Sequence, residues 1–334
     1  MKLNFLDKVL LPVNFILLTV QLILMGTFGG FFTFPLFNLL VPIIAFVNLV
    51  FVSYWLIKLK WPVFIFIFSL LIGFSEWGML YKLPNNAVQV SKGLKVMSFN
   101  VRLFNRYKWI KSKDIPQEIS SFIKAESPDI FCLQEFAREQ SPKFSDYPYR
   151  FIEPSLNKSQ NGLSIFSKFP LINNGVIKFD NSNNGAIYSD LVYEKDTLRM
   201  YNIHLESLRL NISDTLFSQL HSLKFKNRIE QVILKQQFQL KEFEKVDKTN
   251  SYPAIVCTDL NNNAFSEVYN SLNKNLKDLF VETGGGLGAT YKVAYFPFRI
   301  DFIFANPKFE LINFKTHQES LSDHNPISAI IDWK

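Results

Sequence analysis

Apolar positions dominate the first quarter of this chain. Residues 9–57 contain no Asp, Glu, Lys or Arg, and after the interruption "KLKWP" a third apolar run extends to Leu80. A helix crosses the roughly 30 Å hydrocarbon core of a bilayer with about 20 apolar residues. The pattern therefore predicts three transmembrane helices, at about residues 9–26, 35–57 and 63–80. A cleaved signal peptide would explain only the first segment, and a buried helix pair would show a polar stripe.

Lysines predict the orientation of these helices. Lys2 and Lys8 flank the first segment, Lys58 and Lys60 lie between the second and third, and the first connection is uncharged. Because positive residues favour the cytoplasmic side, we expect an integral membrane protein whose chain beyond residue 81 lies outside the cytoplasm. The expected organisation is a membrane anchor at 1–81 that contacts the bilayer through residues 9–80, a polar linker at 82–93 and one large domain at 94–334.

Beyond residue 93 the pattern changes to short apolar runs bounded by Gly, Pro, Asn or Asp, which are typical of strands. These runs lie at 94–99, 129–133, 163–166, 186–193, 198–204, 254–257, 300–304 and 327–332. Helical periodicity occurs at 115–125 and at 222–246, where Ile229, Val232, Ile233 and Phe238 form the expected apolar face. Strands that are apolar on both faces, with helices between them, predict an α/β sandwich of two packed sheets.

Composition adds two limits. The chain has 36 basic and 29 acidic residues, mostly balanced in the large domain, which does not require a polyanionic partner. Its two cysteines, Cys132 and Cys257, both lie in apolar strand-like runs. This placement favours buried, uncombined thiols over a disulfide or a metal site.

Polar side chains stand at or beside the ends of six apolar strands. They are Asn100, Glu135, His204, Asp259 with Asn261, Asp301, and Asp323 with His324. A single Asp or Asn in such a place is usually a turn residue, but six such ends, using two of the four histidines, predict a functional site. The other histidines, His221 and His317, match no motif and are expected to be ordinary surface or loop residues.

The motifs at these strand ends resemble those of the endonuclease/exonuclease/phosphatase superfamily of metal-dependent phosphoesterases, in a membrane-anchored bacterial-type form. The resemblance runs from Leu94 to Trp333 in one order, through "MSFN", "CLQEF", "NGLSIFSKFPLI", "CTDLNNN", "TYKVAYFPFRIDFIF" and "SDHNP". It implies a phosphoester hydrolase with an α/β (α+β) fold, a four-layered α/β/β/α sandwich, here preceded by three transmembrane helices in a bacterial inner or plasma membrane.

The resemblance also implies a cofactor, Mg²⁺ or Mn²⁺. Glu135 is the expected main metal ligand, Asn100 lies beside it, and Asp323 contributes to the metal side. Oxygen ligands of this kind suit Mg²⁺, which proteins hold with one or two carboxylates together with substrate phosphate and water.

The remaining residues of the set are implied to be catalytic. Asp259 orients and deprotonates the attacking water, and Asn261 donates its amide to a phosphate oxygen. His324 faces the scissile phosphate with its other ring nitrogen held by Asp301, and His204 is a second phosphate donor.

The sequence departs from the family pattern at Arg102, where many nucleases of the family have an acidic residue. This puts a second metal ion in doubt and makes Arg102 a candidate phosphate-binding residue. Thr258 and Leu260, beside Asp259, also differ from the usual residues without removing a catalytic group. The loop "GGGLGAT" can be mobile at the mouth of the site, but it lacks the Lys-Ser/Thr ending of a P-loop.

The substrate remains open between several classes. Residues 101–113 interleave basic and aromatic side chains, which can bind a nucleic-acid backbone and its bases, lie against anionic lipid headgroups, or form a solvated loop. The leading prediction is a membrane-tethered phosphodiesterase for nucleic acid or nucleotides. The alternatives are a phospholipid phosphodiesterase or phosphatase of the sphingomyelinase or phosphoinositide type, and a non-catalytic membrane module, against which the complete residue set argues. No protein partner is inferred.

Overall fold

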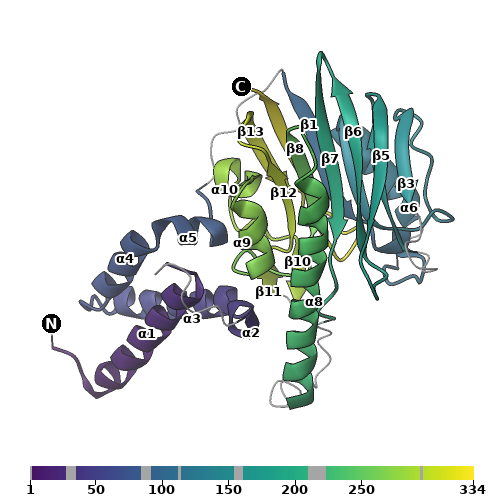
Figure 1. Cartoon of the computed structure of the whole chain (residues 1–334). Coiled ribbons are helices and arrows are strands. Elements are labelled where there is room, and N and C mark those ends of the chain that lie inside the picture. Colours follow the sequence, from purple (N-terminus) through teal and green to yellow (C-terminus); the bar gives the residue numbers. More distant parts are fainter. Residues whose placement is uncertain are drawn as a thin grey trace.

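The computed structural model describes residues 2–27, 35–83, 92–111, 114–153, 161–209, 223–293 and 296–334 (Figure 1). Most of the expected linker at 82–93 lies outside these residues, and so does His221.

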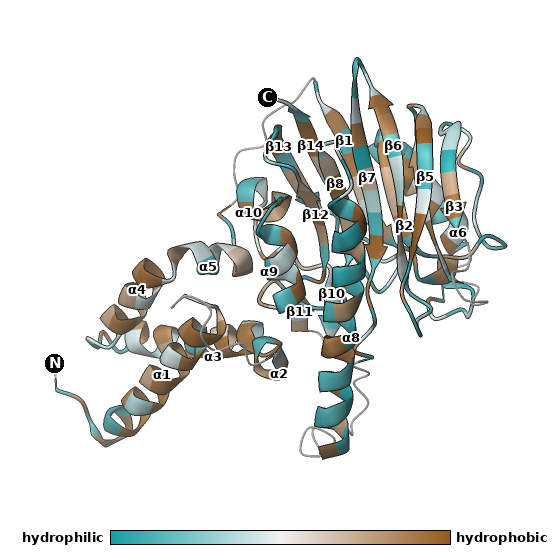
Figure 2. Cartoon of the chain, viewed as in Figure 1, coloured by the Kyte–Doolittle hydropathy of each residue, from teal (hydrophilic) through white to brown (hydrophobic). Residues whose placement is uncertain are grey.

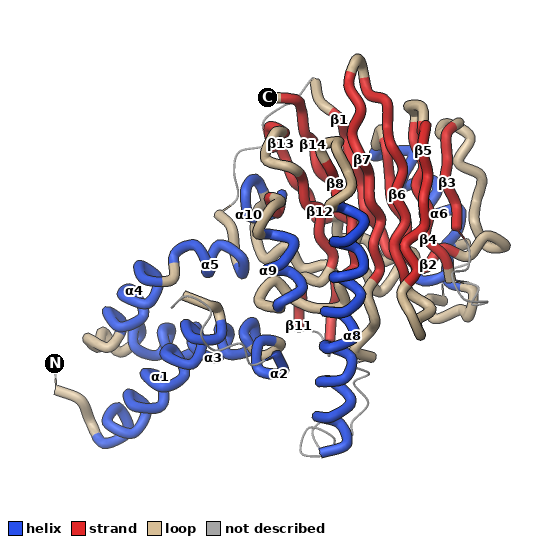
Figure 3. The backbone as a smooth tube through the Cα atoms, in the orientation of Figure 1, coloured by secondary structure: helices blue, strands red, loops and turns tan. Residues whose placement is uncertain are grey.

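The large domain contains two six-stranded sheets within the described residues (Figure 3). The first has the order β13 (Phe309–Thr316), β14 (Ile327–Trp333), β1 (Leu94–Asn100), β2 (Ile130–Phe136), β4 (Gly162–Ser167) and β3 (Tyr149–Glu153). The second has the order β5 (Leu171–Lys178), β6 (Gly185–Tyr193), β7 (Asp196–His204), β8 (Ala254–Asp259), β12 (Asp301–Ala305) and β9 (Lys277–Asp278). A separate hairpin joins β10 (Tyr291–Val293) to β11 (Phe296–Phe298).

Helices cover the outer faces of these sheets. They are η1 (Arg102–Asn105), α6 (Ile115–Glu126), α8 (Leu223–Asp247), α9 (Glu267–Asn273) and α10 (Leu279–Thr283). Val96 of β1 packs in one apolar cluster with Ile255 of β8, between the sheets. The next residue, Met97, packs outward against α6. The alternation explains why the strands are apolar on both faces, and the predicted sandwich of two sheets is confirmed.

The strand pairing brings the polar ends to one edge. β1 runs parallel to β2, and β7 runs parallel to β8, so that His204 lies opposite Asp259. β12 runs antiparallel to β8 and begins where β8 ends, with Asp301 opposite Asp259. β14 is antiparallel to β1, so the segment before it reaches the same edge.

The strands missing from the sequence prediction are short or lie near sheet edges. They are β3, β5, β9, β10, β11 and β13. β5, "LINNGVIK", is mostly exposed and carries polar residues that hide its alternation. The expected face of α8 was wrong at one residue: Phe238 is 47% exposed, whereas Gln236 and Gln239 are buried.

Two further predictions concern single residues. Cys132 and Cys257 are free and buried, as expected. His317 lies in a loop, one of the two expected placements, but it is not at the surface. Its Nε2 lies 2.8 Å from the Ser328 hydroxyl, and its ring packs edge-on against Phe122. The burial of His317 could not be predicted from the local pattern, because the residue lies just past an edge strand.

The buried His317 predicts sensitivity to acid. Burial lowers the pKa of His317 to about 4 from 6.5, although the Glu126 carboxylate opposes the shift. As the pH falls, His317 is protonated near pH 6.5 in the unfolded chain but only near pH 4 in the folded protein. The free energy of unfolding is therefore unaffected by His317 above pH 6.5 and decreases as the pH falls from 6.5 towards 4. His317→Phe should lose less Tm than the wild type between pH 7 and 4.5; equal losses in thermal melts would contradict this.

The N-terminal region contains five helices within the described residues. They are α1 (Phe5–Leu24), α2 (Pro35–Asn38), α3 (Val41–Ile57), α4 (Val63–Ile72) and α5 (Phe74–Leu80). Of these, α1 alone has the length and apolar character of a membrane-spanning helix, and the pair α4–α5 would count as a second only if taken as one span. The expectation of three complete transmembrane helices is therefore wrong as stated.

Local chemistry explains the shorter helices. The second expected segment divides because Pro42 stands in the first turn of α3, a place where proline starts a helix. The third bends by 95° at Gly73. A Cβ at Gly73 would lie 2.9 Å from Leu22, so the glycine allows α1 to approach closely at the bend.

The N-terminal helices expose apolar side chains and bury polar ones, which is the reverse of a soluble helical bundle. Large apolar side chains such as Ile16 and Val50 are exposed. In Figure 2 the ribbon of these helices is mostly in the colours of hydrophobic residues. Inside, Asn48 accepts a hydrogen bond from Asn14 and donates one to Gln21, and all three are buried. Polar contacts therefore join α1 to α3.

Candidate active site

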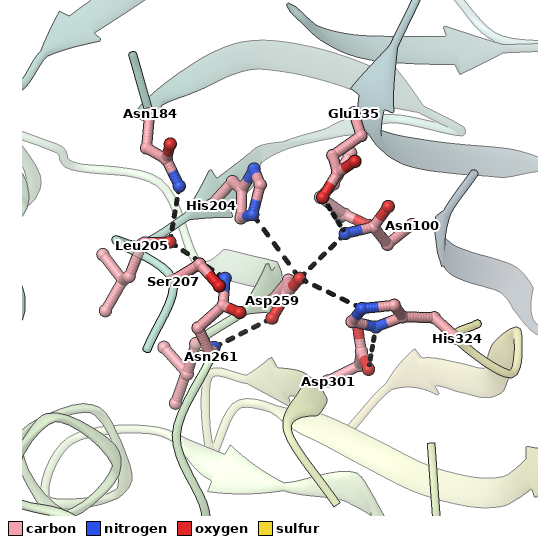
Figure 4. Close-up of polar contacts among 12 residues, drawn as sticks. Asn100, Glu135, Asn184, His204, Leu205, Ser207, Asp259, Asn261, Asp301 and His324 are labelled. Atoms are coloured by element: carbon pink, nitrogen blue, oxygen red, sulfur yellow. Dashed lines mark hydrogen bonds and ion pairs between the residues drawn. The ribbon is translucent and has the colours of Figure 1, made fainter. Parts of the chain in front are cut away.

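Asp259 lies at the centre of the polar strand ends (Figure 4). It is the last residue of β8 and is fully buried. Its Oδ2 accepts a hydrogen bond from the Asn100 amide at 2.9 Å and lies 3.5 Å from His204 Nε2 and 3.9 Å from His324 Nε2. Burial, and next the Asp301 carboxylate, raise the pKa of Asp259 above its usual value. A carboxylate in this state is more basic than an exposed one.

Glu135 reaches the site through a break in its strand. The pairing of β2 with β4 shifts between Leu133 and Phe136, and Glu135 has φ of +48°. A bulge with a left-handed residue turns a side chain away from the regular alternation. As a result, the Asn100 amide nitrogen lies 3.3 Å from Glu135 Oε1 while it also binds Asp259. One amide therefore links the two carboxylates.

His324 is held by Asp301 at the start of β12. His324 Nδ1 lies 2.9 Å and 3.1 Å from the two Asp301 carboxylate oxygens. Burial opposes a charge on the ring, but Asp301 and then Asp259 outweigh it and raise the pKa of His324 to about 10. A protonated ring donates from both nitrogens, which directs Nε2–H towards Asp259 and the space beside it.

His204 and Asn261 differ in how they are held. His204 Nε2 is buried and makes no hydrogen bond among the described residues, and its nearest charged group is Asp259 Oδ2 at 3.5 Å. The Asn261 side-chain amide donates to the Leu205 carbonyl at 3.0 Å, and its backbone N–H donates to Asp259 Oδ1 at 2.8 Å. The expected donation from Asn261 to a phosphate would therefore use a second N–H or require this contact to change.

Asp323 and Arg102 form an ion pair at the rim, with Arg102 Nε 3.2 Å from Asp323 Oδ2. The Arg102 guanidinium also stacks 4.3 Å from the Trp109 ring centroid. Arg102 begins four consecutive non-glycine residues with φ between 42° and 59°, a conformation that costs on the order of 1–3 kcal/mol per residue. Phe104, packed against Phe136, holds this turn in place. Asp323 is thus already paired with a cation.

The donor chemistry at Glu135 fits a divalent metal. Among the described residues, the 3.3 Å contact from the Asn100 amide nitrogen is the only hydrogen bond to the Glu135 carboxylate. The Asn100 side-chain oxygen accepts the Arg102 N–H at 3.0 Å. Asp259, Asp301 and His324 also present ligand atoms within 4.8 Å of one another. A His324 proton shared with Asp301 disfavours a cation there, so the Glu135 carboxylate is the better place for Mg²⁺. Asn100 would add an oxygen ligand only after its amide turns over, because its nitrogen faces Glu135.

Two residues near the site had no predicted role. The Tyr291 ring lies 4.8 Å from the His324 ring, and its backbone pairs with His324 in an isolated bridge. Asn184 donates to the same Leu205 carbonyl as Asn261, at 2.5 Å. Tyr291 stands in the quoted segment "TYKVAYF", which was the available signal, whereas Asn184 stands in an asparagine-rich turn with nothing to mark it.

One comparison with known proteins shows the family of this chain. The sequence matches the model of the Endonuclease/Exonuclease/phosphatase family over residues 97–324. No curated protein sequence matches the chain.

Solved structures are similar in fold at low sequence identity. A Bacteroides vulgatus endonuclease/exonuclease/phosphatase has 18% identity and a TM-score of 0.56, covering 73% of this chain and 100% of the other. D. rerio TDP2 complexed with single strand DNA product has 16% identity and a TM-score of 0.56, and the match covers 72% of this chain and 100% of the other. The Bacteroides thetaiotaomicron mannosyl-6-phosphatase has 16% identity and a TM-score of 0.53, and the match covers 72% of this chain and 100% of the other. Such identities show the fold alone.

Proposed function

This chain belongs to the endonuclease/exonuclease/phosphatase family, whose members are phosphoesterase hydrolases, and from this premise we propose that it hydrolyses phosphoesters with a divalent metal at the Glu135–Asp259–His324 site. The observation that carries the proposal is the Asn100 amide, which contacts the Glu135 and Asp259 carboxylates together. A metal-binding carboxylate and a buried general base are thereby placed side by side, as hydrolysis of a phosphoester requires.

Each residue has a proposed role. Glu135 and Asn100 would hold Mg²⁺ or Mn²⁺, which when bound neutralises charge on the phosphate. Asp259 accepts the proton of the attacking water, and His324, held by Asp301, donates to a phosphate oxygen. His204, Asn261 and Arg102 bind the remaining phosphate oxygens, and Asp323 orients Arg102. The ion pair with Arg102 replaces the expected role of Asp323 on the metal side.

We further propose that residues 1–81 tether the enzyme to a membrane. The inverted pattern of the N-terminal helices supports this, because exposed apolar surface suits lipid and interior amides join helices within a bilayer. The 20 residues of α1 span about 30 Å, the thickness of the hydrocarbon core.

Charges support the proposed orientation. At one end of the helices, Lys60 lies 3.6 Å from Asp7 and donates to the Lys2 carbonyl. At the other end, Leu24 and Val41 pack against Phe265 of the large domain. The lysine-rich end would face the cytoplasm, and the domain at 94–334 would lie outside it, in a bacterial-type inner or plasma membrane.

The first candidate substrate is a nucleic acid or nucleotide. Tyr107 and Trp109 expose 64% and 43% of their surface and lie next to each other beside Arg102. Exposed aromatic rings next to an arginine can stack a base while the guanidinium binds a phosphate. A phospholipid is the second candidate, because Phe46 of α3 contacts Phe296, in the hairpin that adjoins His324.

A panel assay of the full-length protein in detergent and in vesicles tests the proposal. It compares single-stranded and plasmid DNA, RNA, bis-p-nitrophenyl phosphate, phosphoinositide and sphingomyelin. We expect EDTA to stop turnover, Mg²⁺ or Mn²⁺ to restore it, and Glu135→Gln to raise the half-saturating metal concentration by at least about tenfold. The matched control, Glu267→Gln at an exposed position of α9, should leave the half-saturating metal concentration unchanged. Activity that survives EDTA would contradict the metal site.

A further inference from the structure

The loop after Asp259 is fastened to three separate elements. It contains the consecutive asparagines of "DLNNNAF", and each side-chain amide donates to a different partner. The pairs are Asn261 with the Leu205 carbonyl at 3.0 Å, Asn262 with Gln236 of α8 at 2.8 Å, and Asn263 with the Asn38 carbonyl of α2 at 2.9 Å. The catalytic loop is therefore partly built on the N-terminal helices.

The contact with α2 is reciprocal and buried. The Asn38 side-chain amide donates to the Phe265 carbonyl at 2.9 Å, and Asn38 and Asn263 are 5% and 2% exposed. The Phe265 ring packs with Leu24 and Val41. A buried amide that loses its partner is unfavourable, so this pair of hydrogen bonds fixes the position of residues 263–265 against the helices.

A second contact reaches the other half of the site. Phe46 of α3 packs edge-on against Phe296 of the β10–β11 hairpin, with ring centroids 6.0 Å apart. At the base of the hairpin, the Thr290 hydroxyl accepts the Asp301 N–H, and the Thr290 carbonyl accepts the Asn325 N–H. The hairpin thus aligns both members of the His324–Asp301 pair.

We infer that the N-terminal helices position the catalytic residues where they contact the large domain, and that Asn38 is a positioning residue for the loop that carries Asp259 and Asn261. This inference rests on the proposed function. Hydrolysis requires the general base, the metal-binding residues and the histidine to be correctly placed relative to one another. A small displacement of the loop therefore lowers the rate of the chemical step more than it weakens the binding of substrate. Through these contacts the helices would affect the rate of catalysis as well as hold the enzyme at a membrane.

The test compares two buried asparagines of the same helices in the full-length protein. Asn38→Ala should lower kcat by about tenfold to a hundredfold with KM nearly unchanged, and Asn38→Gln should restore part of the loss. Asn48→Ala is the matched control, since Asn48 is equally buried but bonds to Asn14 and Gln21. It should lower Tm to a similar extent while kcat stays near the wild-type value.

Hydrogen exchange gives a readout that does not depend on activity. In Asn38→Ala, backbone amides at 260–266 should exchange faster than in wild type, and in Asn48→Ala they should not. If Asn38→Ala does not fold, Phe46→Ala replaces it in the test, because Phe46 is half-exposed and its loss should leave the fold intact. The same measurement should then show a lower kcat for Phe46→Ala than for Asn48→Ala. Equal kcat and equal exchange in the Asn38 and Asn48 variants would overturn the inference. A wild type inactive on every substrate would instead overturn the proposed function.

Discussion

Replacing Asp259 by Asn is expected to reduce kcat by up to about 10⁴-fold, because the attacking water loses its general base. The carboxamide keeps the Oδ1 oxygen that accepts the Asn261 N–H, and its NH2 group takes the place of the Oδ2 that accepts from the Asn100 amide. The side chain keeps its size and shape, and one hydrogen bond is lost. Measured kcat and KM on the substrate selected by the panel assay give the result.

The fold should not suffer from this change. Burial and the Asp301 carboxylate raise the pKa of Asp259, which means that its charge is unfavourable in the folded protein. Above the usual pKa of an Asp this lowers stability. Removing the charge therefore offsets the lost hydrogen bond from Asn100, and Tm should stay close to the wild-type value. A variant that is destabilised and inactive would leave the catalytic role unsupported, and a variant with near wild-type kcat would end it.

Asp190→Asn is the matched control. Asp190 is also a buried carboxylate in the second sheet, but it binds the Arg199 guanidinium through both oxygens, at 2.6 Å and 2.9 Å. Leaving that arginine buried without its partner should cost about 3–5 kcal/mol of stability, with kcat retained in the protein that remains folded. Asp259→Asn should thus lower kcat without lowering Tm, whereas Asp190→Asn should lower Tm without lowering kcat.

The sequence predicted most of what depends on short-range pattern. Strands such as β1, "LKVMSFN", are mostly apolar because both faces are buried, and this signal was sufficient to find the sandwich. The polar residues at the strand ends were visible for the same reason, since each interrupts an apolar run. Their order along the chain matched the family, and the strand pairing then placed them at one edge.

What the sequence could not predict depends on contacts between distant segments. The turn of Glu135 into the site comes from a bulge against β4, and the orientation of Asp323 comes from Arg102, which has an unusual backbone conformation. The bend at Gly73 depends on Leu22 packing beside it. Hydropathy alone reads residues 63–80 as one straight helix, because it contains no information about such packing.

Replacing His324 by Gln is expected to reduce kcat by about 10²–10³-fold, because a charged donor to the phosphate oxygens is lost. Asp301→Asn should cause a smaller loss, since His324 remains but its Nδ1 is no longer held by a carboxylate at 2.9 Å. Adding Asp301→Asn to the His324 variant should then cost little more, because the two residues act as a unit.

The leaving group distinguishes what His324 does. A donor to the non-bridging phosphate oxygens lowers the barrier for every ester, so the loss in His324→Gln should be similar for a p-nitrophenyl ester and for an alkyl ester. A general acid for the leaving oxygen would instead matter mainly for the alkyl ester, whose alkoxide is a poor leaving group. Because His324 Nε2 points to the Asp259 side, where the water is activated, we expect the uniform loss; a strongly leaving-group-dependent loss would reassign His324 as the acid.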